Sequence, residues 1–448
     1  MNDTIAAIST AQGVGAIAII RVSGDEAIEI VNKIFSKDLG KVKSHTIHYG
    51  YIVYNNEKID EVLISIMKSP KTFTREDIVE INAHGGINTT NKILEILLTE
   101  GCRLAEPGEF TKRALLNGRI DYTQAEGIMD LINSKTDLAR KIAINQLNGK
   151  ASSMIKELRE ELALILANIE VNLNYPEYED IEEMTIDKIK IAMDNIKIKI
   201  KKIITESKNG ELLKEGIKTV IVGKPNVGKS SLLNNLLGEE KAIVTSLEGT
   251  TRDSIEATLI IDNIILNLID TAGIRSTEDI VEKIGVSKSL KLIEEADLVL
   301  FVLDNSEKLS KEDKEIIESL KDKKYIAIIN KCDLPKKIDD EYLENKVYIS
   351  ATENINIDGL KDKIKELFNL EQIETEDLTY LTSARSIAIL NKVEKEIKEV
   401  LNGLNEGFTL DMVEIDLKSI WNLLGEIIGE NYSDELLDTL FSNFCVGK

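Results

Sequence analysis

The feature that most restricts the fold of this chain is residues 223–230, which read GKPNVGKS. This segment matches GxxxxGK[ST], follows an apolar run at residues 219–222 and precedes SLLNNLLG, a helix-like stretch. In such a loop the glycines let backbone N–H groups face phosphates, and the following helix directs its positive end at them. We predict a nucleotide-binding strand–loop–helix unit in which Lys229 reaches the β- and γ-phosphates and Ser230 ligates Mg²⁺. On this motif alone, a chance glycine-rich turn is the alternative.

Three further motifs follow predicted strands, in the order that a guanine-nucleotide domain requires. DTAG provides Asp270 for the Mg²⁺ shell and Gly273 to sense the γ-phosphate. NKCD provides Asp333, which can accept both N–H donors on the Watson–Crick side of guanine, where adenine presents a different pattern. Ser350 and Ala351 can offer a backbone contact to the guanine oxygen. Together the four motifs exclude the chance turn and predict GTP rather than ATP.

Ile274 follows DTAG, where many regulatory GTPases have a glutamine that orients the attacking water. An isoleucine cannot orient water, so another polar side chain must do so. The candidates downstream are Glu278, Asp279 and Glu282.

A second departure is Asn226 inside the phosphate loop, followed by the polar residues 245–251. A side-chain carbonyl beside the phosphates, with loop carbonyls nearby, can bind a monovalent cation where other GTPases use an arginine finger. The alternative is an asparagine that only satisfies its own loop.

The length and the changes of periodicity predict the domain organisation. A chain of 448 residues suggests about three domains. We predict an N-terminal α+β domain at residues 1–118 and a helical domain formed by residues 119–215 and 370–448. A Ras-like P-loop GTPase domain at residues 216–369 is inserted into the helical domain. The fold class is therefore α/β plus all-α, with the nucleotide site in the inserted domain.

Apolar runs of strand length support the two α/β parts. They occur at residues 16–22, 63–67, 219–222, 298–303 and 325–329. Residues 257–261 and 264–269, joined through Asp262 and Asn263, predict a hairpin at the edge of the second sheet.

Two helical stripes mark the helical domain. The first ends at Tyr175 and Pro176, because proline cannot continue a helix. The stripes consist of Ile155, Leu158, Leu162, Ile165 and Ile169, and of Ile189, Met193, Ile196, Ile200 and Ile203. We expect antiparallel helices in an intramolecular bundle; a dimerising coiled coil is the alternative, but neither stripe lasts four heptads.

Composition narrows the possible environments and partners. The net charge of −22 opposes a large non-specific nucleic-acid surface, so an RNA contact would need a local basic patch or a partner. The sequence contains no apolar run long enough for a membrane span and does not begin like a signal peptide. Cys102, Cys332 and Cys445 are too far apart for a zinc or disulfide framework, and His45 and His48 are expected at the surface. We expect a cytoplasmic protein without membrane association.

Beyond the GTPase motifs, the chain resembles the tRNA-modification GTPase family MnmE, also called TrmE. The resemblance covers nearly the whole chain. Its N-terminal part lies in DTIAAIST, IIRVSG, residues 70–86 (PKTFTREDIVEINAHGG) and residues 107–132 (PGEFTKRALLNGRIDYTQAEGIMDLI). GTTRD, DTAGIR and VEKIG match the family's GTPase domain, and the final FCVGK is similar to its FCIGK.

The resemblance implies a homodimeric, potassium-activated GTPase. With a flavin-dependent MnmG-like partner, in a heterotetramer or larger complex, the family adds an aminomethyl or carboxymethylaminomethyl group to the wobble uridine of certain tRNAs. The one-carbon unit comes from a tetrahydrofolate derivative (5-formyl- or methylene-tetrahydrofolate) bound in the N-terminal domain, which also helps hold the dimer together.

The resemblance also implies which residues act. Potassium is expected at Asn226, Thr245, Leu247 and Thr250, Mg²⁺ at Ser230 and Thr251, and the hydrolytic water at Glu282. The nucleotide-binding residues comprise Asn226, Val227, Gly228, Lys229, Ser230, Ser231, Thr245, Ser246, Leu247, Glu248, Gly249, Thr250, Thr251, Asp270, Thr271, Ala272, Gly273, Asn330, Lys331, Asp333, Ser350 and Ala351.

The folate site is carried over to Arg21, Glu80, Arg119 and Lys448. Arg21 or Lys448 can pair with the glutamate tail of a folate, and Glu80 can accept a hydrogen bond from the pterin amine. The family usually has lysine at Arg119, so a forked guanidinium replaces a point charge at this position.

Cys445 and the role of the GTPase leave alternatives. A thiol beside Lys448 can act as a nucleophile or acid toward the base; otherwise Cys445 is a small buried residue that anchors the tail. The competing functions are a GTP-switched RNA-binding or ribosome-assembly protein, and a folate enzyme that the GTPase regulates.

Overall fold

The computed structural model describes residues 3–174, 185–239, 255–269, 291–368, 370, 378–430, 434–442 and 444–448. These residues form two compact units, each described here by itself. The first comprises Met1–Met129, Leu147–Ile191 and Lys395–Lys448, and the second comprises Asp130–Gln146 and Ala192–Glu394. In the described part of the chain, none of the helices is long and apolar enough to cross a membrane.

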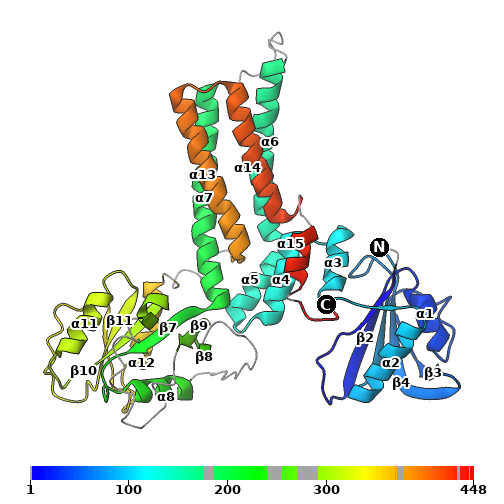
Figure 1. Cartoon of the computed structure of the whole chain (residues 1–448), viewed down its shortest axis with the longest axis horizontal. Helices are drawn as coiled ribbons and strands as arrows, with labels where there is room; N and C mark the ends of the chain where they lie inside the picture. The colour runs from blue at the N-terminus through cyan, green and yellow to red at the C-terminus, as the bar shows by residue number, and fades with distance from the viewer. Residues whose placement is uncertain are drawn as a thin grey trace. The chain divides into compact units, whose positions relative to one another are not determined.

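The first unit contains a six-stranded sheet with the order β3-β4-β5-β2-β1-β6. Its strands are β1 (Ile5–Ile8), β2 (Ile17–Ser23), β3 (Thr46–Tyr54), β4 (Glu57–Met67), β5 (Ile78–His84) and β6 (Arg103–Leu104). Neighbouring strands are antiparallel except β1 and β6. Helices α1 (Ala27–Ile34) and α2 (Ile87–Thr99) pack on one face and bury Ile20 and Val22 of β2 (Figure 1). Because strand residues alternate between faces, Arg21 lies on the opposite face.

The remaining helices of this unit include α3 (Glu109–Leu116), α6 (Lys150–Asn174), α14 (Leu410–Ile428) and α15 (Asp434–Phe441), while α4 (Tyr122–Asn133) begins in it. Helix α6 packs along α14, and its predicted stripe from Ile155 to Ile169 is buried. Arg159 of α6 stacks its guanidinium 3.9 Å from the ring centre of Trp421 of α14. The packing of α6 against α14 is therefore intramolecular, as predicted, while the predicted helix end at Tyr175 and Pro176 lies outside the described residues.

The second unit contains a six-stranded sheet with the order β12-β11-β10-β7-β9-β8. Its strands are β7 (Ile217–Val222), β8 (Ile255–Ile261), β9 (Ile264–Ile269), β10 (Leu298–Asp304), β11 (Tyr325–Asn330) and β12 (Lys346–Tyr348). All pairs are parallel except the edge hairpin β8–β9. The predicted strands and hairpin are confirmed.

Both faces of this sheet are covered, which explains its continuously apolar strands. Helices α8 (Lys229–Glu239) and α12 (Ile357–Leu367) pack on one face, and α11 (Lys311–Ser319) packs on the other. Helix α5 (Asp137–Leu147) and most of α7 (Ile186–Glu215) also belong to this unit, together with the start of α13 (Ala384–Glu406). The second predicted stripe, on α7, is buried.

The architecture has the predicted class: an N-terminal α+β part, a helical part and a P-loop α/β fold. The two compact units divide the chain more coarsely than the four predicted segments do. The boundaries at residues 118, 215 and 369 therefore stay predictions.

Candidate functional site

The predicted phosphate loop joins β7 to α8, with Lys229 as the first residue of the helix. The Nζ of Lys229 donates to the carbonyls of Gly223 (2.8 Å) and Lys224 (2.6 Å), so the side chain folds back over its own loop. Ser230 is exposed in the next position. An ammonium group and a hydroxyl at the start of a helix form the arrangement that sequence analysis predicts for binding phosphate and Mg²⁺.

Gly228 cannot be replaced without strain, because its φ is +98° and its surroundings are closed. A Cβ at this position would lie 2.1 Å from the Nδ2 of Asn330. The glycine thus allows the phosphate loop to pass directly against the NKCD motif at residues 330–333, here called the guanine motif.

Asn330 connects three of the predicted motifs. It lies at the end of β11 with 3% of its surface exposed. Its Nδ2 donates to the carbonyl of Val227 (2.8 Å), and its Oδ1 accepts the N–H of Ala351 (3.0 Å). A guanine oxygen contacting the Ala351 N–H would therefore share or replace this bond. Ser350 beside it is buried, with its hydroxyl 3.3 Å from that of Thr352.

Lys331 makes a second connection to the phosphate loop. Its Nζ donates to the carbonyl of Asn226 (2.9 Å) and to the Oδ2 of Asp304 (2.6 Å). Both Lys331 (φ +60°) and Asn226 (φ +64°) have left-handed backbones. Asn330 and Lys331 thus hold two consecutive carbonyls of the loop.

The planar trans peptide gives these bonds a consequence for anion binding. A carbonyl and the N–H that follows it point in opposite directions. Since the carbonyls of Asn226 and Val227 point toward the guanine motif, the N–H groups of Val227 and Gly228 point away from it. Adjacent N–H groups turned to one side form a concavity that suits phosphate oxygens. Ser231 continues helix α8, and Asp333 is exposed after the turn at Lys331.

Two buried carboxylates near the loop were not singled out by sequence analysis. Asp313, 1% exposed, caps α11 through Ser310 and lies 3.0 Å from the Nζ of Lys224 in the phosphate loop. Burial lowers the pKa of Lys224, but Asp313 and Glu307 outweigh this effect and raise it. The spacing S-x-x-D before an amphipathic helix is a capping signal that could have located Asp313.

The second carboxylate is Asp304. Burial raises its pKa, but hydrogen bonds from Lys331 and Ser306 hold the pKa below its usual range.

Several predicted site residues lie outside the described part of the chain. They comprise Thr245, Ser246, Leu247, Glu248, Gly249, Thr250, Thr251, Asp270, Thr271, Ala272, Gly273 and the water-positioning candidates Glu278, Asp279 and Glu282. Their roles stay predictions.

A second candidate site lies on the first sheet, at the pair formed by Arg21 and Glu80. These residues are cross-strand partners on β2 and β5, and the Arg21 Nε lies 2.9 Å from the Glu80 Oε1. Arg21 also donates to the carbonyl of Gly447 (3.2 Å), which accepts the Ser9 hydroxyl as well (3.0 Å). The end of the chain therefore returns to the sheet and places Lys448, half-buried, next to a residue that contacts Arg21.

The other two predicted residues of this region are exposed. Arg119 places its guanidinium 4.9 Å from the ring centre of Phe73; within the described residues its ring contact is with Phe73, and no bond joins it to Arg21 or Glu80. The thiol of Cys445 is exposed, so the alternative of a buried anchor is wrong. Phe444 provides the anchor instead, because it is buried against Phe441 (5.1 Å between ring centres).

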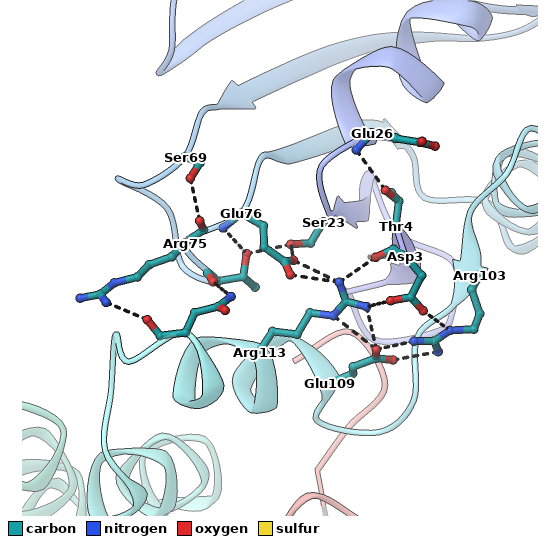
Figure 2. A network of polar contacts seen from close by, with 12 residues as sticks. Asp3, Thr4, Ser23, Glu26, Ser69, Arg75, Glu76, Arg103, Glu109 and Arg113 are labelled. Atoms are coloured by element: carbon teal, nitrogen blue, oxygen red, sulfur yellow. Dashed lines mark hydrogen bonds and ion pairs between the residues drawn. The ribbon is translucent and has the colours of Figure 1, made fainter. Parts of the chain in front are cut away.

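An ionic network centred on the buried residues Arg113 and Glu109 holds helix α3 (Figure 2). Arg113 of α3, 1% exposed, donates to Asp3 (2.8 Å), Glu76 (3.1 Å) and Glu109 (3.0 Å). Arg103 also bonds to Asp3 and Glu109. Burial raises the pKa of Glu109, but its bonds to Arg103, the Glu106 N–H and Arg113 outweigh this and lower it. The i,i+4 spacing of Glu109 and Arg113 was the sequence signal that was missed.

The network has a consequence for the candidate site. It fixes α3, which carries Phe110, and the Arg21 guanidinium lies 5.6 Å from the centre of the Phe110 ring. Arg21 is therefore held by a ring, a carboxylate and a backbone carbonyl.

Comparisons with known proteins cover the chain from end to end. Residues 4–119 match the family model described as "GTP-binding protein TrmE N-terminus", and residues 122–445 match the "MnmE helical domain". The "tRNA modification GTPase MnmE" of Enterococcus faecalis is 51% identical over 100% of this chain and 98% of its own length. The protein of the same name from Bacillus cytotoxicus is 52% identical over 100% and 99%.

Among solved structures, the chain is similar to Era in complex with MgGDPNP and a segment of 16S ribosomal RNA. The match has 32% identity and covers 40% of this chain and 66% of that one. Its TM-score of 0.27 is too low to support a conclusion about the fold.

Proposed function

Because the chain belongs to the MnmE family of tRNA modification GTPases and is a GTP hydrolase, we propose that it couples potassium-dependent GTP hydrolysis to the modification of wobble uridine in certain tRNAs. The added group would be aminomethyl or carboxymethylaminomethyl, made together with a flavin-dependent MnmG-like partner in a heterotetramer or larger complex. The observation that carries this proposal is the 51% and 52% identity with two tRNA modification GTPases over the whole length of this chain. A tRNA substrate implies that the protein acts in the cytoplasm.

In the proposed GTPase site, the two consecutive carbonyl contacts turn the N–H groups of Val227 and Gly228 toward the phosphates. Lys229 at the helix start exchanges its loop carbonyls for β- and γ-phosphate oxygens, and Asp333 accepts from the guanine edge. These fixed dipoles and charges stabilise the negative charge that develops in hydrolysis.

The described residues fit the proposed metal ions. Ser230 is an exposed residue at the start of α8, a position from which a hydroxyl can serve as an Mg²⁺ ligand, and Asn226 is exposed while its backbone carbonyl is held by Lys331. The Asn226 amide oxygen would then be available as a potassium ligand, and the predicted ligands Thr245, Leu247 and Thr250 would complete the site. Potassium supplies positive charge against the phosphates, in place of an arginine finger.

The second candidate site, formed by Arg21, Glu80 and the end of the chain at Lys448, fits a folate. A bound folate would supply the one-carbon unit. Arg21 and Lys448 provide cations for the glutamate tail, and Glu80 provides an acceptor for the pterin amine. The close pairing of Arg21 with Glu80 supports their joint action. A folate carries a carboxylate that can replace Glu80 as the partner of Arg21, and a pterin amine that can replace Arg21 as the partner of Glu80. Arg119, stacked on Phe73, would have to reorient to join them.

The open face of the first sheet supports the proposed homodimer. Ile17, Ile47 and Leu63 are 66%, 67% and 46% exposed on the face opposite α1 and α2. Strand register places them on the same face as Arg21 and Glu80. A second copy of this chain could cover such a face with its own equivalent face, as two-fold symmetry requires. The folate site would then lie beside the dimer interface.

Nucleoside mass spectrometry of tRNA tests the whole proposal. Cells lacking this protein should lose the modified wobble uridine, and the wild-type gene should restore it. Unchanged nucleosides, together with ribosomal subunits that bind the protein only in its GTP form, would favour the ribosome-assembly alternative.

A steady-state assay tests the GTPase part. Turnover should be fast in potassium and slow in sodium at the same ionic strength. Equal rates in the two salts would refute potassium activation and leave the tRNA proposal to the nucleoside assay.

A further inference from the structure

Asp304 is a buried acid next to the nucleotide site that belongs to none of the predicted motifs. It is the last residue of β10, and 6% of its surface is exposed. Its Oδ1 accepts the N–H (2.8 Å) and the hydroxyl (2.7 Å) of Ser306. Its Oδ2 accepts from the Nζ of Lys331 at 2.6 Å. Both oxygens are thus engaged, and the carboxylate has a defined orientation.

Lys331 transmits this orientation to the phosphate loop. A lysine side chain has a flexible four-carbon stem, and holding it in one geometry costs rotamer entropy. The bond to Asp304 restricts the ammonium group to the position from which it reaches the Asn226 carbonyl at 2.9 Å. The backbone also links these elements, since the Asn305 N–H donates to the Asn330 carbonyl at 2.9 Å.

We propose that Asp304 is a positioning residue for potassium-dependent GTP hydrolysis: through Lys331 it holds Asn226 in the conformation that presents the side-chain amide to the cation. This inference rests on the proposed function. The backbone of Asn226 is left-handed, with a φ of +64°, a region that asparagine visits without holding it strongly, so the bond from Lys331 to its carbonyl stabilises this conformation. Asp304 itself touches neither nucleotide nor cation.

The chain offers a matched control in Asp340. This aspartate is 5% exposed, belongs to the same compact unit and pairs with Lys336 at 3.0 Å, as Asp304 pairs with Lys331. Its other partners are Lys346 and Tyr348, so it does not contact the phosphate loop. If the loss of a buried ion pair acted only through protein stability, replacing Asp304 or Asp340 should change GTP turnover to the same extent.

The experiment compares wild type, Asp304→Asn and Asp340→Asn in the full-length protein. Thermal unfolding is recorded, and GTP turnover is measured at saturating GTP over a potassium series at constant ionic strength. Asp304→Asn should raise the potassium concentration for half-maximal turnover about tenfold, the effect of weakening one charge-assisted hydrogen bond. Asp340→Asn should change this potassium concentration by less than about twofold, although it should lower the melting temperature about as much as Asp304→Asn does.

A double-mutant cycle tests the route through Lys331. In a Lys331→Met background, Asp304→Asn should cause no further change in the half-activating concentration, since the ammonium group that it positions is absent. A full additional shift would overturn the inference. Should Asp304→Asn fail to fold, Asp304→Glu keeps the charge and displaces it by one methylene; an intermediate shift supports the inference, and wild-type behaviour overturns it.

The two possible failures are distinguishable. Wild type that turns over equally in sodium and potassium refutes the proposed potassium activation. If the wild type is activated by potassium but Asp304→Asn has the same half-activating potassium concentration, only the role of Asp304 is refuted.

Discussion

Replacing Gly228 by alanine tests whether the phosphate loop and the guanine motif function as one unit. The added Cβ would lie 2.1 Å from the Asn330 Nδ2, so Asn330 must move by more than 1 Å to reach an ordinary contact of about 3.4 Å. Such a movement breaks the bonds from Asn330 to Val227 (2.8 Å) and Ala351 (3.0 Å). The positive φ of +98° adds about 1–2 kcal/mol for any residue with a Cβ.

The structure gives a magnitude for this change. Each buried polar group left without a partner costs about 1–3 kcal/mol, so the variant should lose about 3–5 kcal/mol in the state that binds nucleotide. Every 1.4 kcal/mol is about a factor of ten, which predicts GDP and GTP affinities lowered by about two to three and a half orders of magnitude. Isothermal titration calorimetry with both nucleotides, together with thermal unfolding, measures the effect.

Gly407 provides the control for backbone strain. Its φ is +92°, close to that of Gly228, but a Cβ there would meet nothing within 4 Å. Gly407→Ala should therefore lower the stability only by the backbone strain of about 1–2 kcal/mol and leave nucleotide affinity unchanged. Wild-type affinity in Gly228→Ala, or an equal loss in Gly407→Ala, would refute the steric reasoning.

Four further predictions concern the first unit. Arg113→Met leaves the carboxylate of Glu76 without its cation, whereas Glu109 and Asp3 keep their bonds to Arg103, so the protein should lose about 1–3 kcal/mol of stability in urea unfolding; a loss below about 0.5 kcal/mol would contradict this. Because the pKa of Glu109 is lower in the folded than in the unfolded state, its stabilising contribution is complete above its ordinary pKa of 4.5 and disappears as pH falls through the folded value, so Glu109→Gln should flatten the acid limb of a stability–pH profile. Leu63→Glu should shift the proposed dimer to monomer in sedimentation, whereas Ile415→Glu, on an exposed position of α14, should not. Finally, Cys445→Ser should abolish tRNA modification and preserve GTP turnover, and normal modification would remove the catalytic role of this thiol.

Features that depend on neighbouring residues could be predicted from the sequence. The phosphate loop, the β8–β9 hairpin and the stripe of α6 each follow from turn chemistry or side-chain period within one short segment. The resemblance to a family predicted Arg21, Glu80, Arg119 and Lys448 as a set, but it could not show that Arg21 pairs with Glu80 and with the Gly447 carbonyl, whereas Arg119 stacks on Phe73.

Contacts between distant segments were decided only by the tertiary structure. Asp304, Lys331 and Asn226 meet because parallel strands β7, β10 and β11 end at one edge of the sheet, and no sequence spacing encodes that meeting. Arg113 likewise joins Asp3 across more than a hundred residues. A buried charge needs partners, but the sequence does not say which carboxylates reach it. Local backbone geometry is thus determined by short segments of the sequence, whereas the pairing of buried polar groups depends on which strands and helices pack together.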